Sequence, residues 1–191
     1  MLPEEYLKPR QLPLHLQKRP EPEAPFSFTI REATAADLPD IREIYNYYVL
    51  NSVVTFDLEP MTLDEWQHKY EWVQSLQLPF VVAESASGQI LGFAYVAPWR
   101  QKAAYRRTVE DSIYLRPAAI GKRVGTKLLT EIIERSKAAG VKEIVAVISD
   151  KGAESSIALH EAFGFKHQGH LANVGFKFGR WLGTVLMQKS L

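Results

Sequence analysis

The sequence contains no cysteine among its 191 residues. This absence excludes disulfide bonds, thiolate zinc sites and any mechanism that passes through a covalent acyl-cysteine. Long apolar runs are also missing, since no window approaches the 18 residues of a membrane-spanning helix. The N-terminal stretch has neither the apolar segment of a signal peptide nor the acid-free, arginine-rich face of a transit peptide. We therefore expect a cytoplasmic protein with no membrane partner.

No charge of one sign dominates the chain. Its 23 basic and 22 acidic residues leave a formal net charge of +1. Because this gives no overall field that would attract a polyanion, we expect no nucleic-acid partner. The five histidines show no metal-ligand spacing and there is no cysteine to join them, so we expect no metal site.

Proline and glycine are distributed unevenly. Six of the 11 prolines precede Phe26, whereas all 11 glycines lie at or after Gly88. A stretch so rich in proline and charge forms no helix or central strand and buries little surface. The sequence therefore predicts a Pro-rich arm at residues 1–25. Residues 26–191 have the length of a single domain.

Hydrophobic periodicity after the arm alternates between strand and helix patterns. Helical spacing begins near Asp37, and Thr62 with Glu65 forms a capping box that opens a second helix running towards Leu76. Two further helices are predicted at residues 124–140 and 154–163. Strands are predicted at residues 26–30, 80–84, 90–97, 108–115 and 143–148, near Phe165, and at 181–187. This order describes an α/β or α+β sheet with helices on its faces.

Several segments resemble one family. They are Ala-Pro-Trp-Arg at 97–100, Ala-Tyr-Arg-Arg-Thr-Val-Glu-Asp-Ser-Ile-Tyr at 104–114, residues 51–60 with Thr-Phe-Asp at 55–57, Ser-Ile-Ala-Leu-His-Glu at 156–161, and Val-Gly-Phe-Lys-Phe-Gly-Arg-Trp at 174–181. Together they resemble the GNAT superfamily of acetyltransferases, and within it the phosphinothricin and methionine sulfone/sulfoximine N-acetyltransferase group. The resemblance implies the GNAT fold, with a mixed central sheet of about seven strands and helices on both faces.

The resemblance also implies a site for acetyl-CoA as co-substrate. In this superfamily the donor binds where two parallel strands splay apart, here residues 113–115 and 145–148. A turn before the next helix presents backbone N–H groups to the pyrophosphate. The residues so implied are Ile113, Tyr114, Leu115, Gly121, Lys122, Arg123, Val124, Gly125 and Thr126.

Two residues occupy the positions of catalytic groups. Glu110 stands where the group's proposed general base stands, and the alternative is an acid paired with Arg106 or Arg107. His160 stands where the superfamily often has a tyrosine as general acid, and the alternative is a core or surface histidine. For the acceptor, the resemblance implies Phe56 and Tyr105 as aromatic walls. Lys102 replaces a common arginine and would pair less rigidly with a carboxylate or phosphinate, and the alternative is a solvated lysine on a loop.

The sequence departs from the family pattern at four positions. The usual glutamine or arginine of the pyrophosphate turn is Ile120, and its middle glycine is Arg123. Ala153 replaces an asparagine that bonds the cofactor arm, and Gly183 replaces an aspartate. An arginine at position 123 either obstructs the pyrophosphate or turns outward and adds charge.

The function expected from these features is transfer of an acetyl group from acetyl-CoA to the primary amine of a small amino-acid-like substrate. The group is commonly dimeric, so we expect a homodimer, with Trp181 at the interface. Two alternatives stay open. The protein either acetylates another amine, such as a polyamine or a peptide terminus, or is a catalytically silent GNAT domain that serves as a binding module.

Overall fold

The computed structural model describes residues 26–191, so the predicted arm at 1–25 lies outside the described residues. The chain forms seven strands and four α-helices within this range. The strands are β1 (Phe28–Glu32), β2 (Phe80–Ser85), β3 (Ile90–Pro98), β4 (Thr108–Leu115), β5 (Glu143–Ser149), β6 (Lys166–Lys177) and β7 (Arg180–Ser190). The helices are α1 (Leu38–Asn51), α2 (Leu63–Ser75), α3 (Val124–Ala138) and α4 (Glu154–Ala162). Across the described residues, no helix combines the length and apolar character that crossing a bilayer requires.

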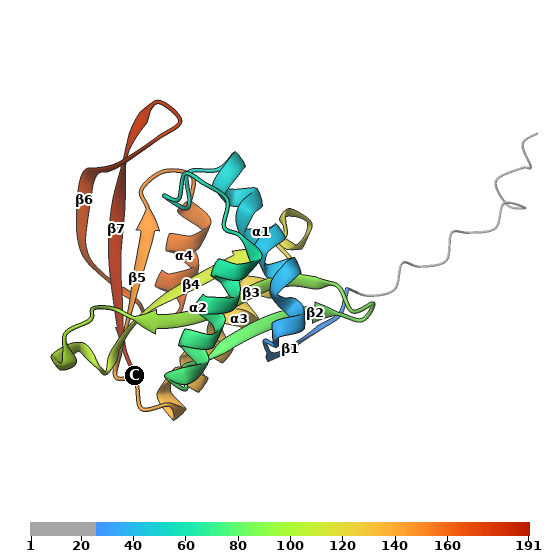
Figure 1. Cartoon of the computed structure of the whole chain (residues 1–191). Coiled ribbons are helices and arrows are strands. Elements are labelled where there is room, and N and C mark those ends of the chain that lie inside the picture. The colour runs from blue at the N-terminus through green and yellow to red at the C-terminus, as the bar shows by residue number, and fades with distance from the viewer. Residues whose placement is uncertain (1–25) are drawn as a thin grey trace, which may run out of the picture.

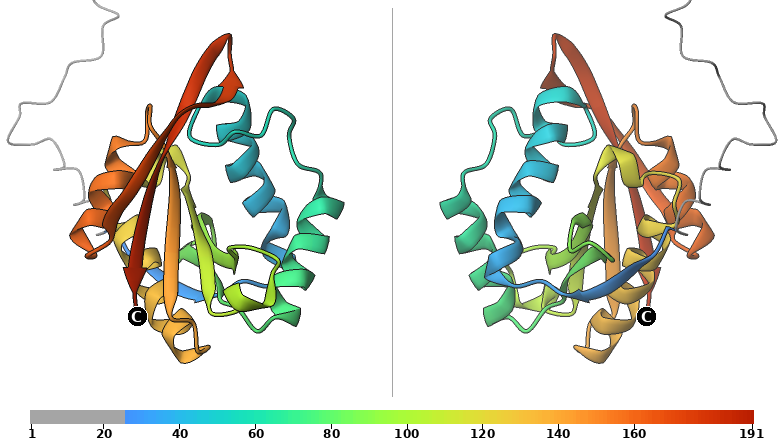
Figure 2. Two further views of the ribbon diagram at one scale, coloured as in Figure 1. Left: turned by 90° about the vertical axis from the view of Figure 1, so that its left-hand side faces the viewer. Right: turned by 90° about the vertical axis from the view of Figure 1, so that its right-hand side faces the viewer.

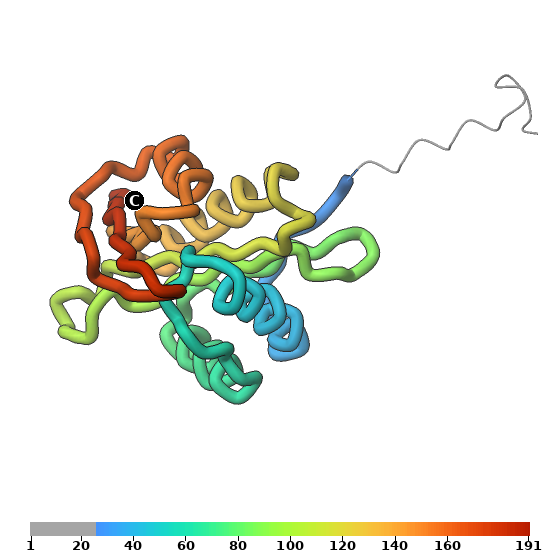
Figure 3. The backbone as a smooth tube through the Cα atoms, turned by 90° about the horizontal axis from the view of Figure 1, so that it is seen from above, coloured from blue at the N-terminus to red at the C-terminus, as the bar shows by residue number. Residues whose placement is uncertain are grey.

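All seven strands belong to one twisted sheet in the order β1-β2-β3-β4-β5-β7-β6 (Figure 1). Only β4 and β5 are parallel, and every other neighbouring pair is antiparallel. Helices α1 and α2 cover one face and α3 and α4 the other, as Figure 2 and the view from above in Figure 3 show. The predicted mixed seven-strand fold is therefore confirmed.

Each face of the sheet carries its own apolar core. Under α1 and α2, Trp66, Phe80 and Phe93 are fully buried and pack edge to face. Under α3 and α4, the core is aliphatic and includes Leu128 and Ile132. Adjacent residues of the strands alternate between the two clusters because side chains of a strand point to opposite faces.

The local signals in the sequence explain most element boundaries. Thr62 caps α2, with its hydroxyl accepting from the Glu65 N–H at 3.2 Å and the Glu65 carboxylate accepting from the Thr62 N–H at 2.7 Å. The predicted strand at 108–115 has the observed bounds. β1 begins and ends two residues later than predicted, and Arg31 within it forms an ion pair with Glu84 of β2.

The β6–β7 hairpin is longer than the sequence indicated. β6 has 12 residues, nearly all exposed, because it lies at the edge of the sheet and packs chiefly on β7, with no helix of residues 26–191 covering it. Its turn places Phe178 and Gly179 at positive φ, as a tight two-residue hairpin turn requires. The tip lies beside the end of α1 (Figure 2), where buried Lys177 donates to the Thr55 carbonyl at 2.9 Å.

Candidate active site

A cleft opens through the sheet where β4 and β5 separate. The two strands pair only at residues 108–110 of β4 and 143–145 of β5. Beyond Glu110, β4 pairs with β3 alone and β5 with β7 alone. The resulting cleft has a volume of about 500 Å³. Of the residues predicted to hold acetyl-CoA, Ile113, Tyr114, Leu115, Gly121, Arg123, Val124, Gly125 and Thr126 line it, and Lys122 does not.

The turn before α3 is rich in free backbone donors. Gly121 and Arg123 both have positive φ, of 77° and 63°. No group in residues 26–191 accepts a hydrogen bond from the N–H of Gly121, Arg123, Val124, Gly125 or Thr126. First-turn N–H groups and the helix dipole favour anions. The turn therefore fits a pyrophosphate even though Arg123 replaces the usual glycine.

Arg123 keeps the backbone shape that glycine would give. It is the N-cap of α3 and adopts φ 63° and ψ 11°, the left-handed conformation. Its side chain is exposed and forms no ion pair with any residue in the described part of the chain. Lys122 points elsewhere, since its ammonium lies 4.5 Å from the centre of the Phe26 ring. The arginine thus adds an uncompensated charge to the cleft wall.

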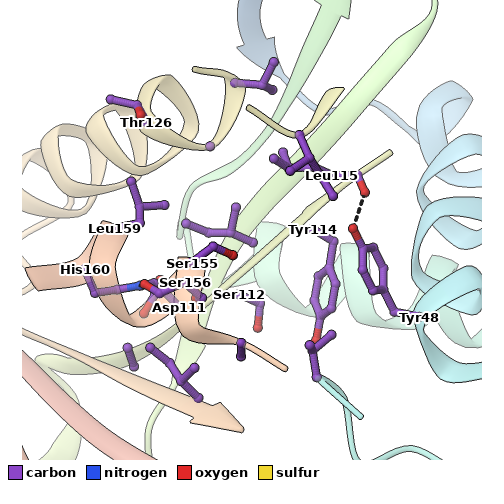
Figure 4. A pocket seen from close by; sticks show the side chains of 18 of the residues that line it. Tyr48, Asp111, Ser112, Tyr114, Leu115, Thr126, Ser155, Ser156, Leu159 and His160 are labelled. Carbon is purple, nitrogen blue, oxygen red and sulfur yellow. Dashed lines mark hydrogen bonds and ion pairs between the residues drawn. The ribbon is translucent and has the colours of Figure 1, made fainter. Parts of the chain in front are cut away.

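Tyr48 of α1 lies on the cleft wall, a role that the sequence did not indicate. Its hydroxyl donates to the Leu115 carbonyl at 2.7 Å (Figure 4). Tyr48 and Tyr114 pack ring against ring, with centroids 5.7 Å apart. The helical spacing of Tyr48 predicted only a core face, so no signal in the sequence distinguished this residue from its neighbours.

Glu110 lies where the cleft narrows. It is the last residue of β4 that pairs with β5, and its carboxylate accepts no hydrogen bond from residues 26–191. Burial raises the pKa of the Glu110 carboxyl, and the nearby Asp111 carboxylate raises it further, while Arg100 and Lys69 offset part of this rise. The alternative, a pairing with Arg106 or Arg107, is not formed in the described residues. A carboxylate with a raised pKa is a stronger base, which suits removal of a proton from an ammonium group.

Asp111 and His160 form a buried pair on the face of the sheet that α3 and α4 cover. His160 Nε2 lies 2.9 Å from Asp111 Oδ2, and Nδ1 lies 2.7 Å from the Ser156 carbonyl (Figure 4). The carbonyl only accepts, so Nδ1 carries a proton, and the contact with Asp111 holds a second one. Burial alone would lower the pKa of His160, but the hydrogen bond and charge of Asp111 raise it. Both ring nitrogens are therefore engaged.

The three residues predicted to hold the acceptor do not line this cleft. Lys102 and Tyr105 are exposed on the loop between β3 and β4, around a short 3-10 turn at Ala103–Tyr105. Phe56 packs against the backbone of Gly175, where an added Cβ would lie 2.5 Å from its ring. Their roles stay predictions.

The structure shows which groups lie around two positions that depart from the family pattern, Ala153 and Gly183. Ala153 is the buried N-cap of α4 and offers no side-chain acceptor, but the Glu154 carboxylate accepts from the Gly152 N–H at 3.2 Å. At Gly183, an added Cβ would lie 2.5 Å from Asp150 Oδ2. That carboxylate, from the end of β5, accepts from the Gly183 N–H at 2.8 Å. Asp150 thus occupies the space that a side chain at 183 would fill.

Comparison with known proteins agrees with this geometry. The family model described as an acetyltransferase (GNAT) domain matches residues 30–186. This chain belongs to the GNAT family of acetyltransferases. The predicted membership and enzyme class are thereby confirmed.

Relatives of this GNAT acetyltransferase match almost their whole length. It is 41% identical to the phosphinothricin N-acetyltransferase of Alcaligenes faecalis, over 85% of this chain and 82% of the relative. It is 40% identical to the L-methionine sulfoximine/L-methionine sulfone acetyltransferase of Pseudomonas aeruginosa, over 86% and 95%. A phosphinothricin acetyltransferase from Sinorhizobium meliloti, solved in complex with acetyl-CoA, superposes with a TM-score of 0.82 at 45% identity, covering 86% of this chain and 88% of that one.

In the part of the chain that the structure describes, no three histidine or acidic side chains gather closely enough to hold a metal ion. The expectation of a metal-free protein stays a prediction.

Proposed function

We propose that this GNAT acetyltransferase moves an acetyl group from acetyl-CoA to the primary amine of a small amino-acid-like acceptor of the phosphinothricin or methionine sulfoximine type. The observation that carries the proposal is the cleft between β4 and β5, with Glu110 at its narrow end and five free N–H groups at its mouth. Relatives at about 40% identity that are named for these acceptors support the substrate class.

Two parts of the chain bind acetyl-CoA in this proposal. The turn at 121–126 receives the pyrophosphate, and the edges of β4 and β5 that lack a strand partner offer backbone groups to the amides of the pantetheine arm. Acetyl-CoA supplies the activated acetyl group as a thioester. An arm that follows β4 from the turn at 121–126 to the point where β4 and β5 meet would bring the thioester near Glu110.

Glu110 is the general base in this proposal. Its carboxylate faces α1 and α2, the side from which Lys69 and Arg100 act on it. There it removes a proton from the acceptor ammonium, directly or through a water, so that the nitrogen can attack the thioester carbon. His160, predicted as a possible acid, has no free ring nitrogen, so any part it plays in proton transfer runs through Asp111.

We also infer a cytoplasmic homodimer. Five large apolar side chains of the β6–β7 hairpin are exposed: Leu171, Val174, Phe176, Phe178 and Trp181. An exposed apolar group of this size on an edge strand favours association. Sedimentation of the wild type and of a variant with Phe176 and Trp181 changed to serine tests it, because a wild-type monomer contradicts the dimer.

The first experiment is a calorimetric titration with acetyl-CoA, followed by thiol release with a panel of amines. We expect binding in the micromolar range, about −8 kcal/mol, and turnover of methionine sulfone, methionine sulfoximine or phosphinothricin but not of spermidine or a peptide amine. Glu110→Gln should bind acetyl-CoA normally and lose turnover. No binding at millimolar donor would favour the binding-module alternative, and preference for spermidine or the peptide would contradict the acceptor class.

A further inference from the structure

Asp111 lines the cleft and carries one carboxylate oxygen with no partner among residues 26–191. Asp111 Oδ2 bonds His160, but Oδ1 is buried and receives no hydrogen bond from residues 26–191. The side chain is 2% exposed, yet the residue lines the cleft. Buried polar atoms in native proteins are almost always paired, so an unpaired carboxylate oxygen beside a ligand cleft points to a donor that the ligand brings.

Asp111 occupies a particular place in the sheet. It is the first residue of β4 beyond the pairing with β5, at the point where the two strands separate. Glu110 is the last paired residue, and because adjacent strand residues point to opposite faces, its carboxylate lies on the α1/α2 side while that of Asp111 lies on the α4 side. The narrow end of the cleft thus has one carboxylate on each face.

Acyl transfer to an ammonium needs more than one proton step. The nitrogen first loses a proton to become a nucleophile and loses another once it has bonded to carbon, while the departing sulfur gains one. Glu110 accounts for the first proton in the proposed function. The second proton must leave nitrogen and a proton must reach sulfur, and both atoms are bonded to the same carbon while this occurs.

We propose that Asp111 Oδ1 carries this second proton from the attacking nitrogen to the departing sulfur. As the C–N bond forms, Oδ1 accepts the proton from nitrogen. As the C–S bond breaks and its electron pair goes to sulfur, Oδ1 gives that proton to sulfur. Asp111 ends as it began, and the net products are the amide, the free thiol and the proton that Glu110 took. The inference rests on the proposed function and extends it.

His160 is a positioning residue in this scheme. Its Nε2 holds Oδ2 while its Nδ1 is anchored on the Ser156 carbonyl, and its ring packs edge to face on Phe165 at 4.8 Å. These contacts hold the carboxylate of a residue that lines the cleft in one orientation, with Oδ1 buried and unbonded. The histidine contacts no reacting atom itself and acts through Asp111.

The test begins with Asp111→Asn in the full-length protein. The asparagine amide can donate to a neutral His160, so the packing is kept while the carboxylate's ability to take a proton is lost. We expect kcat to fall by about 100-fold or more, with the affinity for acetyl-CoA changed by less than about threefold. Glu161→Gln, an exposed change next to His160 on α4, is the matched control and should leave kcat unchanged. A kcat for Asp111→Asn close to that of the wild type would overturn the proposal.

Chemical rescue separates proton transfer from packing. Asp111→Ala leaves room beside His160 for a small planar anion. Formate, which can take up and release a proton, should restore part of kcat, whereas nitrate, of similar shape but hardly basic, should restore only thermal stability. Equal rescue of kcat by the two anions, or none by formate, would contradict the proton-carrying role. The wild type is assayed first for acetyl-CoA binding and turnover, so failure of the proposed function is recognised separately.

Discussion

Arg123 has two consequences of opposite sign, and replacing it with glycine tests both. The residue holds φ 63°, and the left-handed conformation costs a residue with a Cβ roughly 1–2 kcal/mol. Glycine removes this cost but gains freedom in the unfolded chain, worth about 0.4–1 kcal/mol. The free energy of unfolding should therefore rise by about 0.5–1 kcal/mol. For a protein of this size the melting temperature should rise by about 1–4 °C.

The same substitution should weaken donor binding. Arg123 lines the cleft beside the free N–H groups and has no ion-pair partner in the described part of the chain. A hydrogen bond to a charged group contributes about 1.5–3 kcal/mol when buried, and solvent at this exposed position reduces it to about 1 kcal/mol. We expect the Kd for acetyl-CoA to increase about fivefold in calorimetry.

The matched control is Arg123→Ala, which keeps a Cβ in the left-handed conformation and removes the charge. It should bind acetyl-CoA as weakly as Arg123→Gly and melt at the wild-type temperature. Tighter binding by Arg123→Gly would show that the arginine obstructs the pyrophosphate. An unchanged melting temperature for the glycine variant would refute the strain argument.

Three further changes test other parts of the structure. Because the pKa of Glu110 is raised and its ionised form is the base, kcat/KM should fall as pH falls through this pKa. Glu110→Gln should flatten the pH profile and lower kcat about 100-fold. An unchanged profile in this variant would exclude Glu110 as the general base. Gly183→Ala places a Cβ 2.5 Å from Asp150 Oδ2 and 2.6 Å from a β6 carbonyl, so urea unfolding should show a loss of about 2 kcal/mol, and wild-type stability would contradict it. Burial alone would raise the pKa of Asp37, but hydrogen bonds, chiefly from Arg31, lower it. The contribution of Asp37 to stability is therefore present above about pH 4 and is lost as pH falls through the folded-state pKa. Asp37→Asn should lose this acid dependence in unfolding titrations.

Sequence patterns predicted the fold where local chemistry decides the structure. The capping box at Thr62 and Glu65 and the strand-forming run at 108–115 each act through neighbouring residues. The length of β6 could not be predicted in this way. Its exposed residues carry no alternating pattern, and the strand exists because it pairs with β7.

The same distinction between local and long-range contacts holds for the candidate site. The turn at 121–126 and Glu110 could be predicted as candidates because they lie within or beside short segments that resemble the family. The partnership of Asp111 with His160 joins residues 49 positions apart, and the contact of Tyr48 with Leu115 joins residues 67 apart. Such pairs are formed by packing across the sheet, and no local pattern in one sequence indicates them.

The short parallel contact between β4 and β5 affects how readily the sheet opens locally between these two strands. Three residue pairs join a four-strand half, β1 to β4, to a three-strand half, β5 to β7. Amide hydrogens of β4 beyond Glu110 should therefore exchange with solvent faster than those of β3, although both strands lie mid-sheet. A donor bridging the two edges would act as an eighth strand. Binding should then slow exchange on both sides of the gap at once, which makes the acetyl donor a structural part of the sheet as well as a reactant.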